Sequence, residues 1–163
     1  MHVTIVKAGK LHSPGMAEIL NQIIEIGGTT ANATAVDRDY YWQRMQRLPS
    51  RSAWHVAEDE TGRIMGFQFI APEDYLPPEA VDVSTFARPG STGLGIGSAL
   101  FSQTELAAKA LGYAWINANI RTDNVGGLAY YQSRGFEDYG TLKGVRMSNG
   151  LVVDKVLKRY DLT

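Results

Sequence analysis

The chain has 163 residues, the length of one typical domain, and a domain of this size buries roughly 70% of the surface that its unfolded chain exposes. Its 16 Lys and Arg nearly balance its 17 Asp and Glu, and the formal net charge of −1 gives no overall field that would attract nucleic acid or an anionic membrane. With 0 Cys, the chain has no disulfide, thiolate zinc site or cysteine nucleophile, and its 3 His stand in no metal-binding spacing, so no metal is expected.

The first third of the chain predicts one strand and two helices. Residues 2–7 alternate between polar and apolar side chains, as a half-buried strand does. Ser13 and Pro14 offer an N-cap and a first helical residue to a helix whose apolar residues recur at spacings of three and four, and Gly27-Gly28 ends it. Asp37 is expected to cap a second, short helix that runs through Arg47.

The middle of the chain predicts a hairpin and a further strand. Ala53–Glu58 and residues 63–71 are rich in β-forming side chains. The segment Asp59-Glu-Thr-Gly62 between them is typical of a hairpin turn that contains glycine. Residues 72–78 are expected to form a loop, and Ala80–Ala87 predicts the next strand.

A glycine-rich turn leads from this strand into a helix and then into another strand. Apolar residues recur with helical spacing from Ile96 to Leu111, and Gly112 is placed to end the helix. Residues 113–120 predict the following strand. Because a strand–helix–strand crossover is right-handed and joins parallel strands, at least one parallel pair is expected within a mixed sheet.

The end of the chain predicts a short helix and a hairpin. The helix covers residues 124–133 and stops at Gly135, and the hairpin turns at Asn149-Gly150 between runs that end near Met147 and start at Leu151. The N-terminus shows no charged segment followed by an apolar one, and no apolar run approaches the roughly 18 residues of a membrane span. We therefore expect one cytoplasmic domain over residues 1–163, with no membrane or nucleic-acid partner.

The most informative segment is the glycine-rich turn at residues 88–98. Its glycines at 90, 93, 95 and 97 permit positive φ and close approach of the backbone, and the turn presents free N–H groups at the N-terminus of the following helix. Such a turn binds anions, because aligned donors and the positive end of the helix dipole converge on it. The candidate anion-binding residues are Thr92, Gly93, Leu94, Gly95, Ile96, Gly97 and Ser98.

Three interpretations compete for these glycines. A P-loop ends in Gly-Lys-Ser/Thr, whereas Gly97 is followed by Ser98 and Ala99. A dinucleotide fingerprint needs a third glycine where Ser98 stands, and it opens its fold rather than lying in mid-chain. A glycine-rich surface turn without a ligand is the third interpretation.

The turn resembles motif A of the GCN5-related N-acetyltransferase family, Arg/Gln-x-x-Gly-x-Gly/Ala, because Thr92-Gly-Leu-Gly95-Ile-Gly97 matches it at both glycines. Thr92 departs from the motif and removes a long donor for the pyrophosphate. Since a hydrogen bond to a charged group is worth about 1.5–3 kcal/mol, weaker cofactor binding is expected. A second segment, residues 124–136, resembles the family's Asn-x-x-Ala-x-x-Leu-Tyr-x-x-x-Gly-Phe, with the same separation from Asn124 to Tyr131 and from Tyr131 to Gly-Phe.

The resemblance implies a fold, a reaction and a co-substrate. The fold class is α/β, with a central mixed, mostly antiparallel sheet that contains one parallel, splayed pair and is flanked by about four helices. The reaction is transfer of the acetyl group of acetyl-CoA to a primary amine of a small, amino-acid-like acceptor, by direct attack in a ternary complex. Protein N-terminal or lysine acetylation, and a non-catalytic acyl-CoA-binding module, are the alternatives.

The chemistry of that reaction gives a role to Tyr131. Asn124, Leu128 and Tyr131 are spaced to share one face of a helix, which can line the cofactor. The departing thiolate needs a donor, and the resemblance assigns this to Tyr131, with the neighbouring Tyr130 as its rival. Because a phenol of pKa about 10 is a weaker acid than a thiol of pKa about 8.5, Tyr131 is expected to donate a hydrogen bond before it acts as an acid.

The base and the donor to the carbonyl oxygen are assigned to the strand before the turn. Alternation places Asp82 on one face with Ser84 and Phe86. Asp82-Val-Ser84-Thr-Phe86-Ala is similar to Glu-x-Ser-x-Tyr-Val of the phosphinothricin-type acetyltransferases, the group nearest in look. This similarity implies Asp82 as general base through a bridging water, since Asp is one methylene shorter, with Glu79 as the alternative. A backbone N–H at Phe86 or Ala87, where two strands separate to admit pantetheine, is implied as the donor.

Two arginines and the last strand complete the expectations. Arg88 and Arg121 flank the proposed site and are candidates for contacts with phosphate or a substrate carboxylate. Dimers recur in the family. The closing strand, residues 151–157, could contribute an edge to a homodimer.

Overall fold

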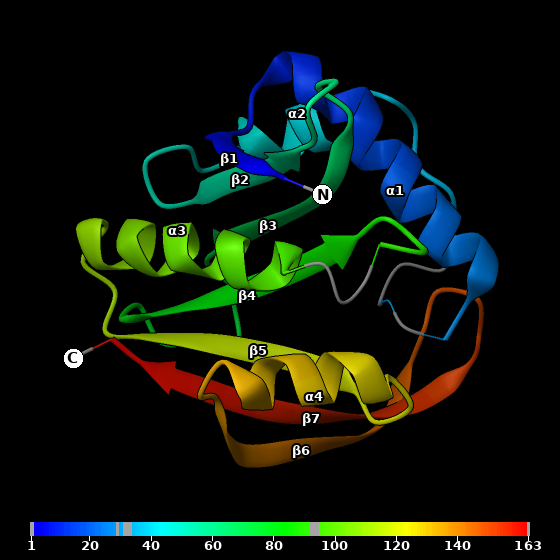
Figure 1. The fold of residues 1–163 in the computed structure, drawn as a ribbon. Coiled ribbons are helices and arrows are strands. Elements are labelled where there is room, and N and C mark those ends of the chain that lie inside the picture. The colour runs from blue at the N-terminus through cyan, green and yellow to red at the C-terminus, as the bar shows by residue number, and fades with distance from the viewer. Residues whose placement is uncertain (1, 29, 31–33, 92–94, 163) are drawn as a thin grey trace.

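A computed structural model of the chain describes residues 2–28, 30, 34–91 and 95–162 (Figure 1). They form one seven-stranded sheet in the order β1-β2-β3-β4-β5-β7-β6. The strands are β1 (Thr4–Lys7), β2 (Ala53–Glu58), β3 (Ile64–Ala71), β4 (Ala80–Ala87), β5 (Trp115–Arg121), β6 (Glu137–Arg146) and β7 (Val152–Asp161). The helices are α1 (Ser13–Ile26), α2 (Tyr40–Met45), α3 (Ile96–Ala110) and α4 (Val125–Ser133), and a single 3-10 turn, η1 (Lys10–His12), precedes α1.

The predicted hairpins form as expected. In the turn between β2 and β3, the Asp59 N–H donates to the Arg63 carbonyl at 3.0 Å, and Gly62 takes a φ of 84°, which favours glycine. In the turn between β6 and β7, Gly150 takes a φ of 87° and donates to the Met147 carbonyl at 2.9 Å. Both turns are therefore specified locally, by glycine where the backbone is left-handed.

The sheet contains one parallel pair, as predicted, and that pair separates. β4 and β5 pair only over Ala80–Trp115, Val81–Ile116 and Asp82–Asn117. Beyond Asp82, β4 stays paired with β3 through Ala87, whereas β5 stays paired with β7 through Arg121. The carboxyl-terminal halves of β4 and β5 thus diverge, and the sheet opens between them (Figure 1).

Helices cover both faces of the sheet. Helices α1 and α2 pack with Trp54, Phe67 and Phe69, and the ring of Phe86 lies against this cluster. Helices α3 and α4 lie together on the opposite face, where Tyr131 belongs to the larger apolar cluster (Figure 1). No helix in the described part of the chain is long and apolar enough to cross a membrane.

Two expectations about the first helices are wrong in detail. Ser13 is not the N-cap of α1 but its first residue, and His12 takes the cap position. The buried Ser13 hydroxyl instead donates to the Arg38 carbonyl at 2.8 Å and accepts the Trp42 N–H at 3.0 Å, so it ties α1 to the start of α2. Helix α2 begins at Tyr40 rather than after Asp37, because Asp37 forms a turn whose carboxylate accepts the N–H of residue 39.

The expected dimer edge is also wrong. β7 lies between β5 and β6 and is hydrogen-bonded on both sides, so residues 151–157 do not form an edge of the sheet. β6 holds that edge instead. The hairpin order alone did not reveal this, because either strand of the hairpin could have paired with β5.

Candidate functional site

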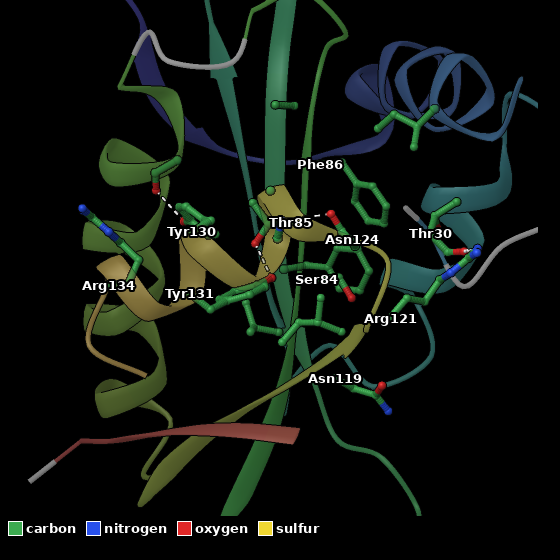
Figure 2. Close-up of a pocket in the computed structure, with 18 of the residues that line it drawn as sticks. Thr30, Ser84, Thr85, Phe86, Asn119, Arg121, Asn124, Tyr130, Tyr131 and Arg134 are labelled. Atoms are coloured by element: carbon green, nitrogen blue, oxygen red, sulfur yellow. Dashed lines mark hydrogen bonds between the residues drawn. The ribbon is translucent and has the colours of Figure 1, made fainter. Parts of the chain in front are cut away.

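The gap between β4 and β5 opens into a cleft of about 1020 Å³ (Figure 2). Its walls come from α1, α2, β3, β4, β5 and β7, from the N-terminus of α3, and from α4. It brings together the described residues that the sequence predicts for the site, namely Asp82, Phe86, Ala87, Gly95, Ile96, Gly97, Ser98, Asn124 and Tyr131. Thr92, Gly93 and Leu94 lie outside the described residues. No cluster of three or more His, Asp or Glu in the described chain could hold a metal ion.

One end of the cleft is the N-terminus of α3. Gly95 takes the N-cap position with a φ of 78°, and no side chain in the described part of the chain caps this end of the helix. A Cβ at Gly95 would meet no atom within 4 Å among the described residues that are not its chain neighbours. The first amides of a helix have no intrahelical acceptor, and α3 spans 15 residues, so its dipole adds positive potential here. This end fits an anion such as a diphosphate.

Gly97 has a second role that the motif does not indicate. A Cβ at this position would lie 2.5 Å from Cε1 of Tyr130, whose hydroxyl donates to the Gly97 carbonyl at 2.7 Å. Only glycine therefore lets α4 approach α3 this closely. The contact between Gly97 and Tyr130 holds together α3 and α4, the two helices that frame the cleft.

Gly97→Ala is expected to lower the free energy of unfolding by about 1–3 kcal/mol, because the Tyr130 ring must move. Gly126→Ala is the matched control, since a Cβ there meets only Oδ1 of Asn124, at 4.0 Å, and alanine in a helix is favoured over glycine. Urea unfolding of both variants measures the difference. Equal stability of the two variants would contradict the close contact.

Arg134 is a cation at the anion end that the sequence analysis did not single out. It lines the cleft just after α4, and its Nη1 donates to Oγ of Ser98 in the first turn of α3 at 2.7 Å (Figure 2). Its buried Nε has no partner among the described residues. A guanidinium here is placed to meet an anion bound at the helix terminus.

The two arginines that the sequence did single out are engaged elsewhere. Arg88 does not line the cleft, because it is buried with Nη1 on the Glu18 carboxylate at 2.6 Å and Nε on the Ile64 carbonyl at 2.9 Å. The expectation that Arg88 meets a ligand is therefore wrong. Arg121 does line the cleft, and it donates to the Asp123 carboxylate and, at 3.2 Å, to the Thr30 carbonyl (Figure 2). The Arg121 guanidinium is thus part of the cleft wall, and its donors are engaged by the protein rather than directed at a ligand.

Two neighbouring tyrosines of α4 face the cleft with different hydrogen bonds. Tyr131 is 6% exposed, and its hydroxyl lies 2.7 Å from Oγ1 of Thr85 on β4. Burial raises the pKa of Tyr131 well above its ordinary value, so the phenol keeps its proton at neutral pH. The Tyr130 hydroxyl already donates its hydrogen bond to the Gly97 carbonyl. Of the two rivals, only Tyr131 has a proton that is not tied to the backbone.

Asn124 begins the helix that carries both tyrosines. Its side chain accepts the Gly127 N–H at 2.9 Å, which caps α4. It also lines the cleft, beside the diverging strands. The residue predicted to contact the cofactor thus also has a structural role, because it caps the helix that carries Tyr131.

Asp82 lies at the last paired position of β4, where the strands begin to part. It is half-buried, and Oδ1 accepts from Nδ2 of Asn117 at 2.8 Å and lies 3.5 Å from the Tyr75 hydroxyl. Burial raises the pKa of Asp82 to about 7, and the hydrogen bond from Asn117 opposes that rise. Such a carboxyl can exchange a proton near neutral pH. Glu79, the alternative base, is exposed and does not line the cleft.

Asp82 and Tyr131 approach the gap from opposite faces of the sheet. Side chains alternate along β4, so Asp82 shares the α1 and α2 face with Phe86, whereas Thr85 and its partner Tyr131 lie on the α3 and α4 face. A group threaded through the gap would therefore meet a proton acceptor on one side and a donor on the other.

The backbone of β4 also alternates. The Arg88 N–H donates to Met65 on β3, and the Glu79 carbonyl accepts from Ala114 beside β5, so odd-numbered residues of β4 direct their amides toward the gap. Of the two predicted donors to a carbonyl oxygen, Ala87 points its N–H into the gap, and Phe86 points its N–H toward β3.

The chain is similar to known proteins in sequence and in fold. Residues 18–136 match the family model described as "Acetyltransferase (GNAT) family". No curated protein matches the chain. A ribosomal-protein-alanine N-acetyltransferase from Brucella melitensis is similar at 25% identity, over 97% of this chain and 99% of that chain, with a TM-score of 0.87. An N-acetyltransferase from Staphylococcus aureus Mu50 is similar at 23% identity, over 100% of both chains, with a TM-score of 0.88. A phosphinothricin acetyltransferase from Sinorhizobium meliloti, solved with acetyl-CoA, is similar at 23% identity, over 99% of this chain and 89% of that chain, with a TM-score of 0.85. These likenesses confirm the predicted fold.

Proposed function

The chain belongs to the acetyltransferase (GNAT) family, and on that premise we propose that it transfers the acetyl group of acetyl-CoA to a primary amine of a small, amino-acid-like acceptor by direct attack in a ternary complex. One observation carries the proposal. β4 and β5 part after Asp82 and Asn117, and one cleft holds both the N-terminus of α3, which no described side chain caps, and the Asp82 carboxyl, whose pKa burial raises to about 7.

The residues of the cleft fit acetyl-CoA in two places. The amides of Gly95, Ile96, Gly97 and Ser98 would hold the diphosphate, with Arg134 beside them, and Thr92, Gly93 and Leu94 stay a prediction from the motif. Tyr131, Asn124 and the strand residues Phe86 and Ala87 would line the pantetheine arm. When bound, this co-substrate supplies an activated thioester.

Two side chains and one backbone amide around the gap share the chemistry. Asp82 accepts the proton of the attacking amine, directly or through a water. The Ala87 N–H stabilises the negative charge that develops on the carbonyl oxygen, since a preorganised amide donor needs no reorganisation. Tyr131 donates a hydrogen bond to the leaving sulfur from the opposite face.

The cleft also suits an acceptor with charges of both signs. Arg44, Glu73 and Lys155 line it together with apolar residues of α1 and the Phe69 ring. Burial raises the pKa of Glu73 and lowers the pKa of Lys155, because the low dielectric of the cleft disfavours the charged form of each group. A molecule that carries an amine and a carboxylate close together complements this lining. The Brucella melitensis structure at 25% identity favours the α-amine of a protein N-terminus as a second candidate acceptor.

Release of free thiol from acetyl-CoA in the presence of an amine panel tests the proposal. The panel holds free amino acids, decarboxylated amines of the same side chains, an alanine-terminated peptide and a lysyl peptide. We expect amino acids to exceed their decarboxylated partners in kcat/KM. Preference for the alanine peptide would show that the acceptor is a protein N-terminus. Acetyl-CoA binding without turnover of any amine would contradict the proposed enzymatic activity and favour a binding module.

Arg134→Ala is expected to weaken acetyl-CoA binding about tenfold or more, because a hydrogen bond to a charged group is worth about 1.5–3 kcal/mol. Arg146→Ala, an exposed arginine at the end of β6 and outside the cleft, is the matched control. Calorimetric titration with CoA and with dephospho-CoA measures both affinities. If Arg134 meets the diphosphate, the variant loses the same factor for both ligands, whereas equal binding by both variants would contradict the role of Arg134.

A further inference from the structure

A partly buried row of hydrogen bonds links β3, β4 and α4 behind the proposed leaving-group donor. Gln68 on β3 is 0% exposed, and its Nε2 lies 2.8 Å from Oγ1 of Thr85 and 3.0 Å from the hydroxyl of Tyr130. Gln68 and Thr85 are register partners across β3 and β4. Thr85 in turn contacts the Tyr131 hydroxyl at 2.7 Å (Figure 2).

The surroundings fix which way the Gln68 amide faces. A tyrosine hydroxyl has one proton, and Tyr130 gives its proton to the Gly97 carbonyl. It can therefore only accept from Gln68. The group of Gln68 that faces the row is the NH₂, and its second N–H is directed at Thr85.

The direction of the next bond follows from the same counting. Thr85 accepts from Gln68, and its own proton can then be given to the Tyr131 oxygen, which lies 2.7 Å away. If Tyr131 donated to Thr85 instead, the Thr85 proton would have to compete for the Tyr130 oxygen, which already accepts from Gln68. The favourable arrangement runs from Gln68 through Thr85 to Tyr131, and donors aligned in one direction polarise one another.

We propose that Gln68 and Thr85 are positioning residues that orient the Tyr131 hydroxyl so that its proton points into the cleft at the leaving sulfur. This inference rests on the proposed function. Neither residue touches the reacting atoms. Their effect is that Tyr131 receives a hydrogen bond on its oxygen and has its own proton free to donate, and the raised pKa of Tyr131 keeps that proton in place.

Substitution of Thr85 separates orientation from packing. Thr85→Val removes the hydroxyl at nearly constant shape, and Thr85→Ser keeps the hydroxyl and removes the methyl group. We expect Thr85→Val to lower kcat about tenfold, the value of one modest hydrogen bond, with the KM for acetyl-CoA within about twofold of wild type. Thr85→Ser should recover most of the kcat.

Gln68→Glu tests the direction of the row. A carboxylate at position 68 accepts from Thr85, so Thr85 must then accept from Tyr131 and the proton of Tyr131 is withdrawn from the cleft. We expect a loss of kcat at least as large as in Thr85→Val, in protein that circular dichroism shows to be folded. Wild-type kcat in a folded Gln68→Glu variant would overturn the inference.

A spectroscopic measurement on the free protein needs no acetyl transfer. With ¹³C-labelled tyrosine, the Cζ resonance that disappears in Tyr131→Phe belongs to Tyr131. It should shift in Thr85→Val and return in Thr85→Ser, while the resonance of Tyr160, bonded to Glu105, stays constant. An unchanged Tyr131 resonance in Thr85→Val, or a Thr85→Ser variant as slow as Thr85→Val, would overturn the inference. An inactive wild-type protein would contradict the proposed function alone.

Discussion

Tyr131→Phe is expected to lower kcat about 100-fold or more while the affinity for acetyl-CoA stays close to wild type. General acid catalysis by a side chain that is positioned in the transition state contributes about 10²–10⁴-fold. The phenol of Tyr131 is buried, keeps its proton and lies at the side of the gap opposite Asp82. Phenylalanine keeps the ring in the apolar cluster and removes only the hydroxyl.

The neighbouring tyrosine provides the control for that measurement. Tyr130→Phe removes a hydroxyl whose proton is bound to the Gly97 carbonyl, so it should reduce stability more than it reduces kcat. Thiol release gives kcat for both variants, and calorimetry gives the affinity for acetyl-CoA. If Tyr130→Phe loses more kcat than Tyr131→Phe, Tyr130 is the donor and the assignment is wrong.

Asp82→Asn is expected to lower kcat/KM about 100-fold at pH 8 and to remove the limb of the pH profile near pH 7. Burial raises the pKa of Asp82 to about 7, so the wild-type carboxyl is protonated below that pH and cannot accept a proton from the amine. The wild-type log(kcat/KM) should therefore rise by about one per pH unit below about pH 7 and level off above it. Asparagine can still accept the hydrogen bond from Asn117 but cannot act as a base.

The pH dependence of stability provides an independent check on the state of Asp82. Its folded-state pKa of about 7 lies above the ordinary value of 3.8, so folding favours the protonated form. The contribution of Asp82 to stability is thus complete below about pH 4 and is lost as the pH rises through 7. Asp82→Asn should match wild type in urea unfolding near pH 4 and exceed it at pH 8. A variant that is less stable than wild type at pH 8 would show that the carboxylate is stabilised by its surroundings, and the base role would lose its support.

The elements of the fold were largely predictable because their signals are local. The predicted strands Ala53–Glu58 and Ala80–Ala87 coincide with β2 and β4, since alternation and flanking turn residues mark both ends. The crossover of β4, α3 and β5 follows from the same local signals together with the handedness rule. The place of β7 inside the sheet could not be predicted, because strand order depends on pairing between distant segments.

The chemistry of the site was predictable only where a motif carried it. Asp82 and Tyr131 stand in motifs, and the structure places both on the cleft. Arg88 was misjudged because its partner, Glu18, is 70 positions away in the sequence. Gln68 and Arg134 were missed for the same reason, since their contacts with Tyr130 and Ser98 span 62 and 36 positions. The missing long donor at position 92 was the one signal that could have directed attention to Arg134.

The central claim is that the first turn of α3 and the gap between β4 and β5 bind acetyl-CoA. Calorimetric titration of the folded wild-type protein with acetyl-CoA tests it most directly. The account predicts a single saturable site per chain, weakened by Arg134→Ala and unchanged by Arg146→Ala. No heat of binding up to millimolar acetyl-CoA would contradict the account, whatever the sequence motifs indicate.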